Sequence, residues 1–339
     1  MKVYFTVDVE TSMGGAWGDP GLRPLPCERR IFCPVDGEML GIPRICGLLE
    51  QFGFRGTFFV ETLAADVNGD ADCRPAFDLL LARGHDVQLH AHPNFHFYAQ
   101  YRRSLDGGGG FDRSGMSDLF SRLPAGVQAE ILGRAAENFV RLTGRRPACF
   151  RAGGFAANRE TLRALAGLGI GLDSSYSPCY RSQHSFPGEN LPVNRPVRLE
   201  GVWVAPAMVA RSPLPEGAEG FKMADISTIS NREMRHLLET ARGAGLRHAV
   251  LLLHSFSLVK ARDVQYTRLR PDRIVLARLE RMLQWLAENR DRYEVSTLGE
   301  LAADPAGLAQ DQGAPAPVLP LAAAAGRKLV QAANRLYWV

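Results

Sequence analysis

The chain has 339 residues, of which 46% are hydrophobic and 22% are charged, and this length is ample for a full hydrophobic core. Its 40 Lys and Arg residues against 36 Asp and Glu give a formal charge of +4, too small and too dispersed to favour a nucleic-acid-binding protein. Only four of the basic residues are lysines, and this excess of Arg points to a GC-rich bacterial source. Length alone allows one large α/β domain or two smaller ones.

The N-terminal segment predicts a strand and no export signal. Its residues MKVYFTVDVE lack the long apolar core of a signal peptide, and no run of 18 apolar residues follows that could span a membrane. We therefore expect a cytoplasmic protein, either free or peripheral to the inner membrane.

The six cysteines form no CxxC pair and no dense framework. In a reducing cytoplasm they are expected to be free thiols. A disulfide or a metal pair formed by Cys27 and Cys33 is the alternative.

Short apolar or β-branched runs alternate with helix-like segments along most of the chain. The predicted strands are residues 2–9, 56–60, 86–90, 148–152, 169–174, 249–254 and 293–297. The predicted helices are residues 40–52, 74–83, 126–143, 159–168, 231–243 and 272–289. This alternation predicts a parallel α/β architecture, either a barrel or an open sheet.

Two long segments and a tail interrupt the alternation. Residues 94–123 contain a run of glycines and several arginines, and we expect a flexible basic loop that is either a lid or a surface insertion. Residues 176–229 are rich in Pro and are expected to form a small β-hairpin region beside the site. Residues 319–339 predict a helix that docks on its own domain or on a partner subunit, with membrane attachment as the alternative.

Ionisable side chains stand at the ends of the predicted strands. In a barrel and in an open parallel sheet alike, functional side chains lie at the carboxyl ends of the strands. The residues found there are Asp8, Glu10, Glu61, His90, His92, Arg151, Asp173 and His254. This placement is typical of an α/β enzyme.

The first and third predicted strands carry residues suited to a metal ion. Asp8 and Glu10 are two residues apart and share one face of a strand, where they would repel each other unless a cation or a proton separates them. His90 and His92 also share a face, and four of the eight histidines fall between residues 85 and 96. Together these residues predict a site of one carboxylate and two imidazoles, with open positions for water.

Three further strand ends carry candidate catalytic groups. His254 ends an apolar strand and could act as a general acid or base. Arg151 precedes two glycines and could hold a carboxylate in its charged form. Asp173 could pair with an imidazole and tune it. Arg151 and Asp173 could instead form structural ion pairs.

Six motifs follow one another in a familiar order across residues 3–256. They are TVDVE, GTFFVE, GHDVQLHAHP, FRAGGF, DSSYSP and LLLHSF. In these motifs the sequence resembles the polysaccharide deacetylase superfamily, the NodB-homology proteins of carbohydrate esterase family 4. The resemblance implies a distorted (β/α)7 TIM-like barrel over residues 1–302, with insertions at about 94–123 and 176–229. An Ala/Pro-rich linker over 303–318 and a helical tail over 319–339 would follow.

The resemblance also implies roles for the strand-end residues. Asp8 stands at the position of the catalytic base, and Arg151 at the position of the arginine that braces it. His254 corresponds to the general acid, and Asp173 to the acid that tunes it.

The expected metal ligands depart from the common family pattern. Glu10 stands one position after the usual metal-binding Asp, in a DxE variant, and His90 matches the first metal histidine. The second histidine normally follows four residues later, where this chain has Asn94. His92 is the expected second ligand because a proline follows it, and His96 is the reserve.

These roles imply a metal-dependent N-deacetylase. A divalent ion, expected to be Zn²⁺ with Co²⁺, Ni²⁺, Fe²⁺ or Mn²⁺ as alternatives, would activate a water that attacks the amide of an N-acylated amino sugar. Asp8 would act as base and His254 as acid. Without an export signal, a nucleotide- or lipid-linked precursor of a bacterial surface polysaccharide (O-antigen, capsule or exopolysaccharide) is the expected substrate. The phosphate of such a precursor could meet Arg102, Arg103 and Arg181.

Two other functions stay open at this stage. The chain could hydrolyse another C–N bond, as in formamides or ureides. It could also be a catalytically silent member that binds carbohydrate or scaffolds a complex, because the usual metal-binding Asp is replaced. A homo-oligomer is also left open.

Overall fold

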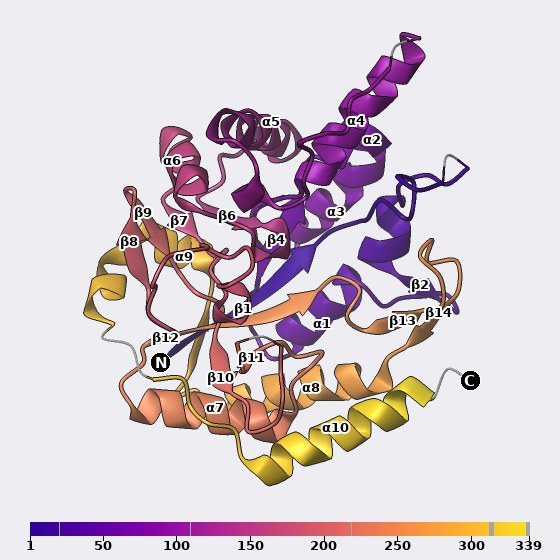
Figure 1. The fold of residues 1–339 in the computed structure, drawn as a ribbon. Helices are drawn as coiled ribbons and strands as arrows, with labels where there is room; N and C mark the ends of the chain where they lie inside the picture. The colour runs from indigo at the N-terminus through magenta and orange to yellow at the C-terminus, as the bar shows by residue number, and fades with distance from the viewer. Residues whose placement is uncertain (20, 109, 218, 312–314, 337–339) are drawn as a thin grey trace.

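A curled sheet of seven parallel strands forms the centre of the computed structural model, which describes residues 1–19, 21–108, 110–217, 219–311 and 315–336 (Figure 1). An antiparallel strand, β8 (Val197–Leu199), extends one end of the sheet. The parallel strands lie in the order β12 (His248–His254), β1 (Lys2–Val9), β4 (Thr57–Glu61), β5 (Asp86–Ala91), β6 (Cys149–Ala152), β7 (Leu172–Asp173) and β9 (Val202–Val204).

The chain that follows β9 closes the curled sheet into a distorted barrel. The N–H of Ala205 donates to Asp173 in β7, whereas the N–H of Met208, three residues later, donates to Val250 in β12. Asp225 forms a further parallel bridge to β12. The gap between the first and last strands of the sheet is therefore spanned by isolated bridges.

Each of the seven predicted strands overlaps an observed one, but their pairing differs in one respect. The last predicted strand, β15 (Glu294–Ser296), pairs only with Lys2–Tyr4 of β1. The remainder of that edge of β1 is taken by β4, which pairs with Thr6–Val9. The seventh parallel strand of the sheet is instead β9, which pairs with β7 and was expected to form part of a hairpin beside the site.

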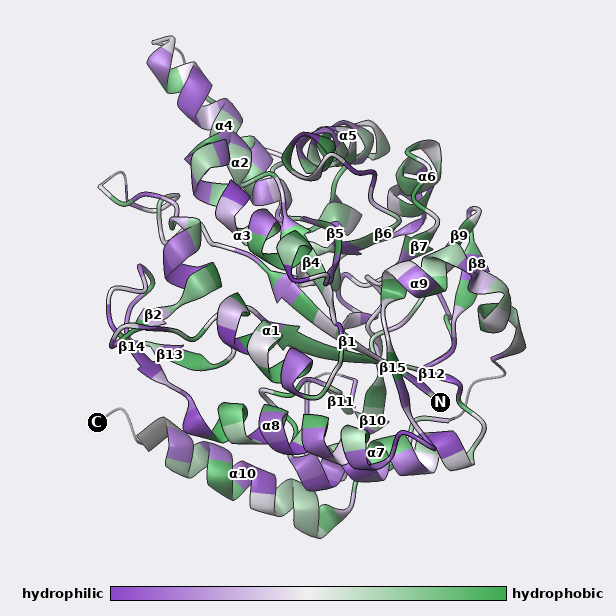
Figure 2. Ribbon diagram, turned by 180° about the vertical axis from the view of Figure 1, so that it is seen from behind, coloured by the Kyte–Doolittle hydropathy of each residue, from purple (hydrophilic) through white to green (hydrophobic). Residues whose placement is uncertain are grey.

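Helices surround the sheet and bury one face each. Figure 2 shows that the strands are mostly hydrophobic, whereas the helices carry both hydrophobic and polar residues. In α8, for example, Val275, Leu279, Met282 and Leu286 are buried, as the sequence predicts. The six predicted helices correspond to α1 (Ile42–Gln51), α3 (Asp70–Ala82), α5 (Ala125–Thr143), α6 (Arg159–Gly167), α7 (Asn231–Gly243) and α8 (Arg273–Glu288).

The expectation of a flexible loop from residue 94 is wrong for its first half, which is the helix α4 (Pro93–Asp106). Proline at its first turn and aromatic packing account for the helix, since Tyr98 and Tyr101 contact the ring of Trp17. The far end of α4 projects beyond the rest of the molecule (Figure 1).

Short elements complete the chain. Two more helices are α2 (Ala65–Asn68) and α9 (Leu298–Ala303). Three small antiparallel pairs are β2 (Pro34–Val35) with β3 (Glu38–Met39), β10 (Val209–Arg211) with β11 (Phe221–Met223), and β13 (Val259–Ala261) with β14 (Leu269–Pro271).

The C-terminal helix α10 (Leu321–Leu336) packs on the outside of the barrel, along α7 and α8 (Figure 1). Its Arg327 is buried and forms ion pairs with Glu233 and Glu216, at 2.9 and 2.6 Å. The predicted tail extends to residue 339, and residues 337–339 lie outside the described part of the chain. No described helix is long and apolar enough to cross a membrane.

All six cysteines are free thiols. The partner of the buried Cys27 is Cys73, with 3.3 Å between their sulfur atoms, and not Cys33 as the sequence alternative assumed. Cys33 instead donates its S–H to the carbonyl of Arg30.

Gly41, directly before α1, allows its backbone to approach that of Ile31 and Phe32 closely. A Cβ added at Gly41 would overlap the carbonyl group of Ile31. Gly41→Ala is therefore expected to lower the free energy of unfolding by about 1–3 kcal/mol. The matched control is Gly133→Ala in α5, where nothing lies within 4 Å and Ala favours the helix by about 0.5–1 kcal/mol. Denaturant unfolding of both variants decides, and equal stabilities would contradict the prediction.

Candidate active site

The register of the parallel strands brings most of the strand-end residues to one edge of the sheet. Asp8 of β1 lies directly opposite His254 of β12. His90 of β5 lies opposite both Glu61 of β4 and Arg151 of β6. Residues from five strands, between positions 8 and 254, therefore meet at one edge of the sheet.

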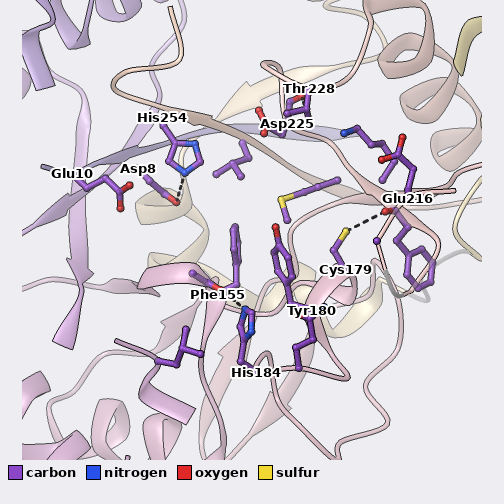
Figure 3. A pocket seen from close by; sticks show the side chains of 18 of the residues that line it. Asp8, Glu10, Phe155, Cys179, Tyr180, His184, Glu216, Asp225, Thr228 and His254 are labelled. Atoms are coloured by element: carbon purple, nitrogen blue, oxygen red, sulfur yellow. Dashed lines mark hydrogen bonds and ion pairs between the residues drawn. The ribbon is translucent and has the colours of Figure 1, made fainter. Parts of the chain in front are cut away.

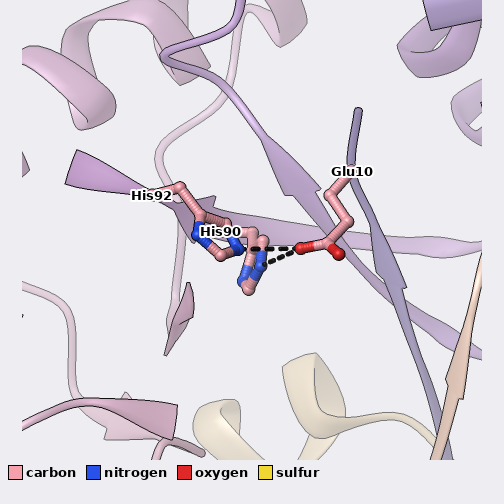
Figure 4. Close-up of side chains that lie close together, drawn as sticks. All are labelled: Glu10, His90 and His92. Atoms are coloured by element: carbon pink, nitrogen blue, oxygen red, sulfur yellow. Dashed lines mark hydrogen bonds and ion pairs between the residues drawn. The ribbon is translucent and has the colours of Figure 1, made fainter. Parts of the chain in front are cut away.

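Glu10, His90 and His92 form a tight cluster at this edge (Figure 4). The Nε2 atoms of His92 and His90 lie 2.8 and 3.2 Å from the same oxygen, Oε2 of Glu10. One ligand atom from each residue falls within 4.8 Å of the others. His90 and Glu10 are buried, and His92 is partly exposed.

The other ring nitrogen of each histidine is already engaged. Nδ1 of His90 donates to the carbonyl of Arg151 at 2.8 Å, and Nδ1 of His92 contacts Asp118 at 2.9 Å. In neutral imidazoles both Nε2 lone pairs then point at the carboxylate of Glu10. Three acceptors directed at one point repel one another unless a proton or a metal ion lies between them, and the outer partners are those that commonly orient metal-binding histidines. The residues therefore fit a divalent metal ion.

The charges around the cluster also favour a positive charge at this point. Burial by itself raises the pKa of Glu10, but the charge of His92, the close contacts of both imidazoles and the guanidinium of Arg30 outweigh it and hold this pKa well below its ordinary value. Burial lowers the pKa of His92, but Asp118 and Glu10 hold it well above its ordinary value. A metal ion at the centre would supply the charge that these carboxylates favour.

Gly153, directly after β6, lies against the same histidine. A Cβ added there would overlap the imidazole of His92. One of the two glycines in the FRAGGF motif thus makes room for a candidate metal ligand.

Asp8 is held by a buried arginine beside this cluster. Arg151 is fully buried, and its Nη1 donates to Oδ1 of Asp8 at 2.7 Å. Its Nη2 and Nε donate to the hydroxyl and the carbonyl of Ser174, at 3.0 and 3.2 Å, while the guanidinium lies over the ring of Phe59. Arg151 is thus fixed on several sides, and it fixes the orientation of Asp8 in turn.

His254 faces the second oxygen of the same carboxylate (Figure 3). Its Nε2 lies 3.9 Å from Oδ2 of Asp8, and its ring leans against Phe256. About a quarter (26%) of its side chain is exposed, so the imidazole is accessible from the pocket.

The structure does not bring Asp173 to His254. The carboxylate of Asp173 is fully buried and accepts the hydroxyl and the N–H of Ser175, at 2.5 and 3.0 Å. Across the described part of the chain, no hydrogen bond or ion pair joins Asp173 to His254. Burial raises the pKa of Asp173 to about 7, although the bonds from Ser175 and the charge of Arg151 oppose this. An acid two residues before a serine closes a local turn, and this turn competes with the expected pairing.

His96, the alternative second metal ligand, lies on α4 away from the Glu10–His90–His92 cluster. Its Nε2 is 2.8 Å from the amide of Gln100, and it does not belong to the cluster around Glu10. Asn94 instead helps to hold Asp118, the residue that contacts His92, because the N–H of Asn94 donates to Asp118 at 2.9 Å. The geometry favours His92 as the second histidine.

The sequence analysis named Glu61 without giving it a role, and it did not name Arg30 or Asp118. Arg30 pairs with Glu10 at 3.2 Å, and Asp118 orients His92. Glu61 accepts the N–H of His92 at 2.5 Å, and burial raises its pKa to about 7 against the charges of the two histidines. The strand-end position of Glu61 was a usable signal, whereas Arg30 and Asp118 stand in segments without periodic patterning.

One side of a pocket of about 610 Å³ is lined by Asp8, Glu10, His90, His92 and His254 (Figure 3). The opposite side comes from the Pro-rich segment 176–229, which contributes Cys179, Tyr180, Glu216, Lys222 and Asp225 among others. A second pocket of about 430 Å³ shares Glu10 and His92 with the first, so open space reaches the cluster from two sides.

The arginines that the sequence offered for a phosphate lie elsewhere. Arg102 and Arg103 line a separate hollow beside Asp66. Arg181 forms an ion pair with Glu219 at 2.7 Å. None of the three lines the pocket at the strand ends, as far as the described residues define it.

Known proteins share this architecture at low sequence identity. No family model and no curated protein matches the sequence. A candidate polysaccharide deacetylase from Mycobacterium smegmatis is 19% identical, covers 94% of this chain and 93% of its own, and gives a TM-score of 0.56. A family 4 carbohydrate esterase from Streptomyces lividans, solved with acetate, is 14% identical over 93% of this chain and 97% of its own, with a TM-score of 0.43. A CE4 family pseudoenzyme from Bacillus anthracis is 12% identical over 89% and 65%, with a TM-score of 0.42.

Identities this low support a shared fold alone. Of the three structures, the one from Mycobacterium smegmatis is similar enough to support it. The chain shares the fold of this candidate polysaccharide deacetylase, and its curled sheet of parallel strands is consistent with the distorted barrel that the motifs predicted.

Proposed function

We propose that the protein is a metal-dependent hydrolase that removes an N-acyl group, in the simplest case acetyl, from an amino sugar. The observation that carries this proposal is the position of Asp8. Its carboxylate is oriented by Arg151, stands beside the Glu10–His90–His92 cluster and faces His254 within one pocket.

Glu10, His90 and His92 would hold the divalent ion, and Zn²⁺ suits one carboxylate with two imidazoles. When bound, such an ion polarises a carbonyl group and lowers the pKa of water. Arg30 and Asp118 would keep two of the ligands in place through the contacts described above.

Asp8 would act as the general base. Its Oδ1 accepts the hydrogen bond from Arg151, while Oδ2 faces His254 across the pocket and would accept a proton from the attacking water. The rigid clamp around Arg151 fixes the direction of that proton transfer.

His254 would act as the general acid. It stands across from Asp8 on the neighbouring strand and is open to the pocket, so that it can deliver a proton to the leaving nitrogen. The products are then a free amino sugar and a carboxylate.

The substrate is proposed to be an N-acylated amino sugar, either nucleotide- or lipid-linked, used in bacterial surface polysaccharide synthesis. The pocket volume lies within the range of ordinary small-molecule sites, which supports a substrate of one or two sugar rings. The biosynthetic setting rests on the sequence alone.

Single substitutions in the Asp8–His254 pair test the catalytic roles. Asp8→Asn and His254→Ala are each expected to lower the rate of acetate release from N-acetylglucosamine oligomers or UDP-N-acetylglucosamine by roughly 10²–10⁴-fold, because each removes a proton-transfer group. The metal content of both variants should stay near that of the parent. If metal-loaded parent protein releases no carboxylate from any N-acyl sugar, the proposal fails.

Removal of a ligand should act differently, through the metal itself. His90→Ala is expected to lose the divalent ion, and a chelator should abolish turnover until the ion is restored. Elemental analysis and reconstitution with Zn²⁺ or Co²⁺ provide the measurement. A parent protein that binds no divalent ion would overturn the metal assignment.

Asp118 provides a subtler test, because it contacts the outer nitrogen of His92 and the N–H of Asn94 and is not itself one of the candidate metal ligands. Asp118→Asn is expected to weaken Zn²⁺ binding by roughly 10- to 100-fold in competition with a chelator. The matched control is Asp112→Asn, an exposed acid of the same segment that bonds only Ser114. Equal Zn²⁺ affinities in the two variants would contradict the role of Asp118.

A further inference from the structure

The side of the pocket opposite Glu10, His90 and His92 contains an ammonium group that has no role in the proposed hydrolysis. Lys222 of β11 lines the pocket together with Glu216 and Asp225. Among the described residues it is the only Lys or Arg that does so. The chain has only four lysines, so this one is not part of a general basic surface.

Lys222 is partly buried and has no hydrogen bond or ion pair from its ammonium group to any described residue. Burial lowers the pKa of Lys222 and the charge of Arg327 lowers it further, whereas the charges of Glu216 and Asp225 offset only part of this effect. A half-buried ammonium without a partner is costly, and a ligand anion would compensate it.

The acids near Lys222 are engaged elsewhere. Glu216 is held by Arg327 and Lys328 of α10, at 2.6 and 3.1 Å. Asp225 accepts both the N–H and the hydroxyl of Ser227, at 2.8 and 2.7 Å. Helix α10 thus restrains the carboxylate best placed to neutralise Lys222.

Aromatic rings lie between the two sides of the pocket. Figure 3 shows Asp8, Glu10 and His254 on one side, Glu216 on the other, and Phe155 and Tyr180 between them. Tyr180 stacks on Phe155 at 6.2 Å and on His184 at 5.1 Å between ring centroids. These stacked rings line the pocket between Glu10, His90 and His92 on one side and Lys222 on the other, where the sugar ring of a substrate would lie.

We propose that Lys222 binds an anionic group of the N-acyl sugar substrate, a phosphate or a carboxylate, and that α10 keeps Lys222 available by holding Glu216. This inference rests on the proposed function for the identity of the sugar. Lys222 is then a specificity-determining residue at a distance from the reacting amide.

The test is calorimetric binding to metal-loaded protein, so that turnover is not needed. The probes are N-acetylglucosamine, its 1-phosphate and 6-phosphate, and N-acetylmuramic acid as the carboxylate. At least one anionic sugar is expected to bind roughly 10- to 100-fold more tightly than N-acetylglucosamine, as a charge-assisted contact would give. The strongest probe tells phosphate from carboxylate.

Substitution of Lys222 should remove this preference selectively. Lys222→Met is expected to bind all four sugars with about the affinity of the neutral one, whereas Lys222→Arg should retain part of the preference. The matched control is Lys2→Met, whose ammonium is half exposed and pairs with Glu294. If no anionic sugar is preferred, or if Lys222→Met keeps the preference, the inference is overturned.

The role of α10 has its own variants. Arg327→Met should free Glu216 to pair with Lys222 and so reduce the preference for the anionic sugar, and adding Glu216→Gln should restore it. Lys328→Met, a half-exposed position, should act in the same direction more weakly and with less risk to folding. Melting curves confirm that each variant is folded. An unchanged preference in Arg327→Met and Lys328→Met would overturn this role.

The same data separate this inference from the proposed function. Acetate release without any preference for anionic sugars overturns the assignment of Lys222 alone. A preference that depends on Lys222, without release of carboxylate from any probe, overturns the proposed hydrolase and leaves the anion site standing.

Discussion

Charges buried at the carboxyl edge of the sheet must find partners, and the arrangement of the site follows from this requirement. Arg151 is fully buried, and Asp8 and Glu10 nearly so. Removing one member of a buried ion pair costs about 3–5 kcal/mol, because the other is left uncompensated. Each of these charges therefore has a dedicated partner, and the partners come from distant parts of the chain.

This requirement links the site to the fold. Arg151 ties β6 to β1 through Asp8 and to the chain after β7 through Ser174. Arg30 brings the segment after β1 back onto Glu10 while its guanidinium lies over Phe256, just beyond β12. The groups that position the chemistry are thus also groups that hold neighbouring strands and loops in place.

The part of the site that the sequence predicted is the part governed by strand geometry. Residues two apart on a strand share a face, and the carboxyl ends of parallel strands share an edge. These two rules were enough to group Asp8 with Glu10 and His90 with His92. They also placed His254 at the same edge of the sheet as Asp8, and the register of β12 and β1 brings the two opposite each other.

The part that the sequence did not predict depends on contacts that no local pattern encodes. Asp118 reaches His92 only because Asn94 and α4 hold its segment against the strand ends. The arginines and glycines of that segment suggested a loop, whereas aromatic packing makes its first half a helix. For Asp173 the sequence suggested a long-range partner, an imidazole. The structure shows a local turn instead, in which Ser175 donates two hydrogen bonds to the Asp173 carboxylate.

The gap in the barrel has a consequence for how such a protein can change over evolution. The chain after β9 crosses this gap through isolated bridges, and the segment that supplies the far side of the pocket is inserted there. The candidate metal ligands come from β1, β5 and the residues just after them, outside this insertion. Under the proposed function, substrate choice and bond cleavage therefore fall to separate stretches of sequence. Remodelling of this one insertion would then reshape the pocket while the candidate metal ligands stay in place.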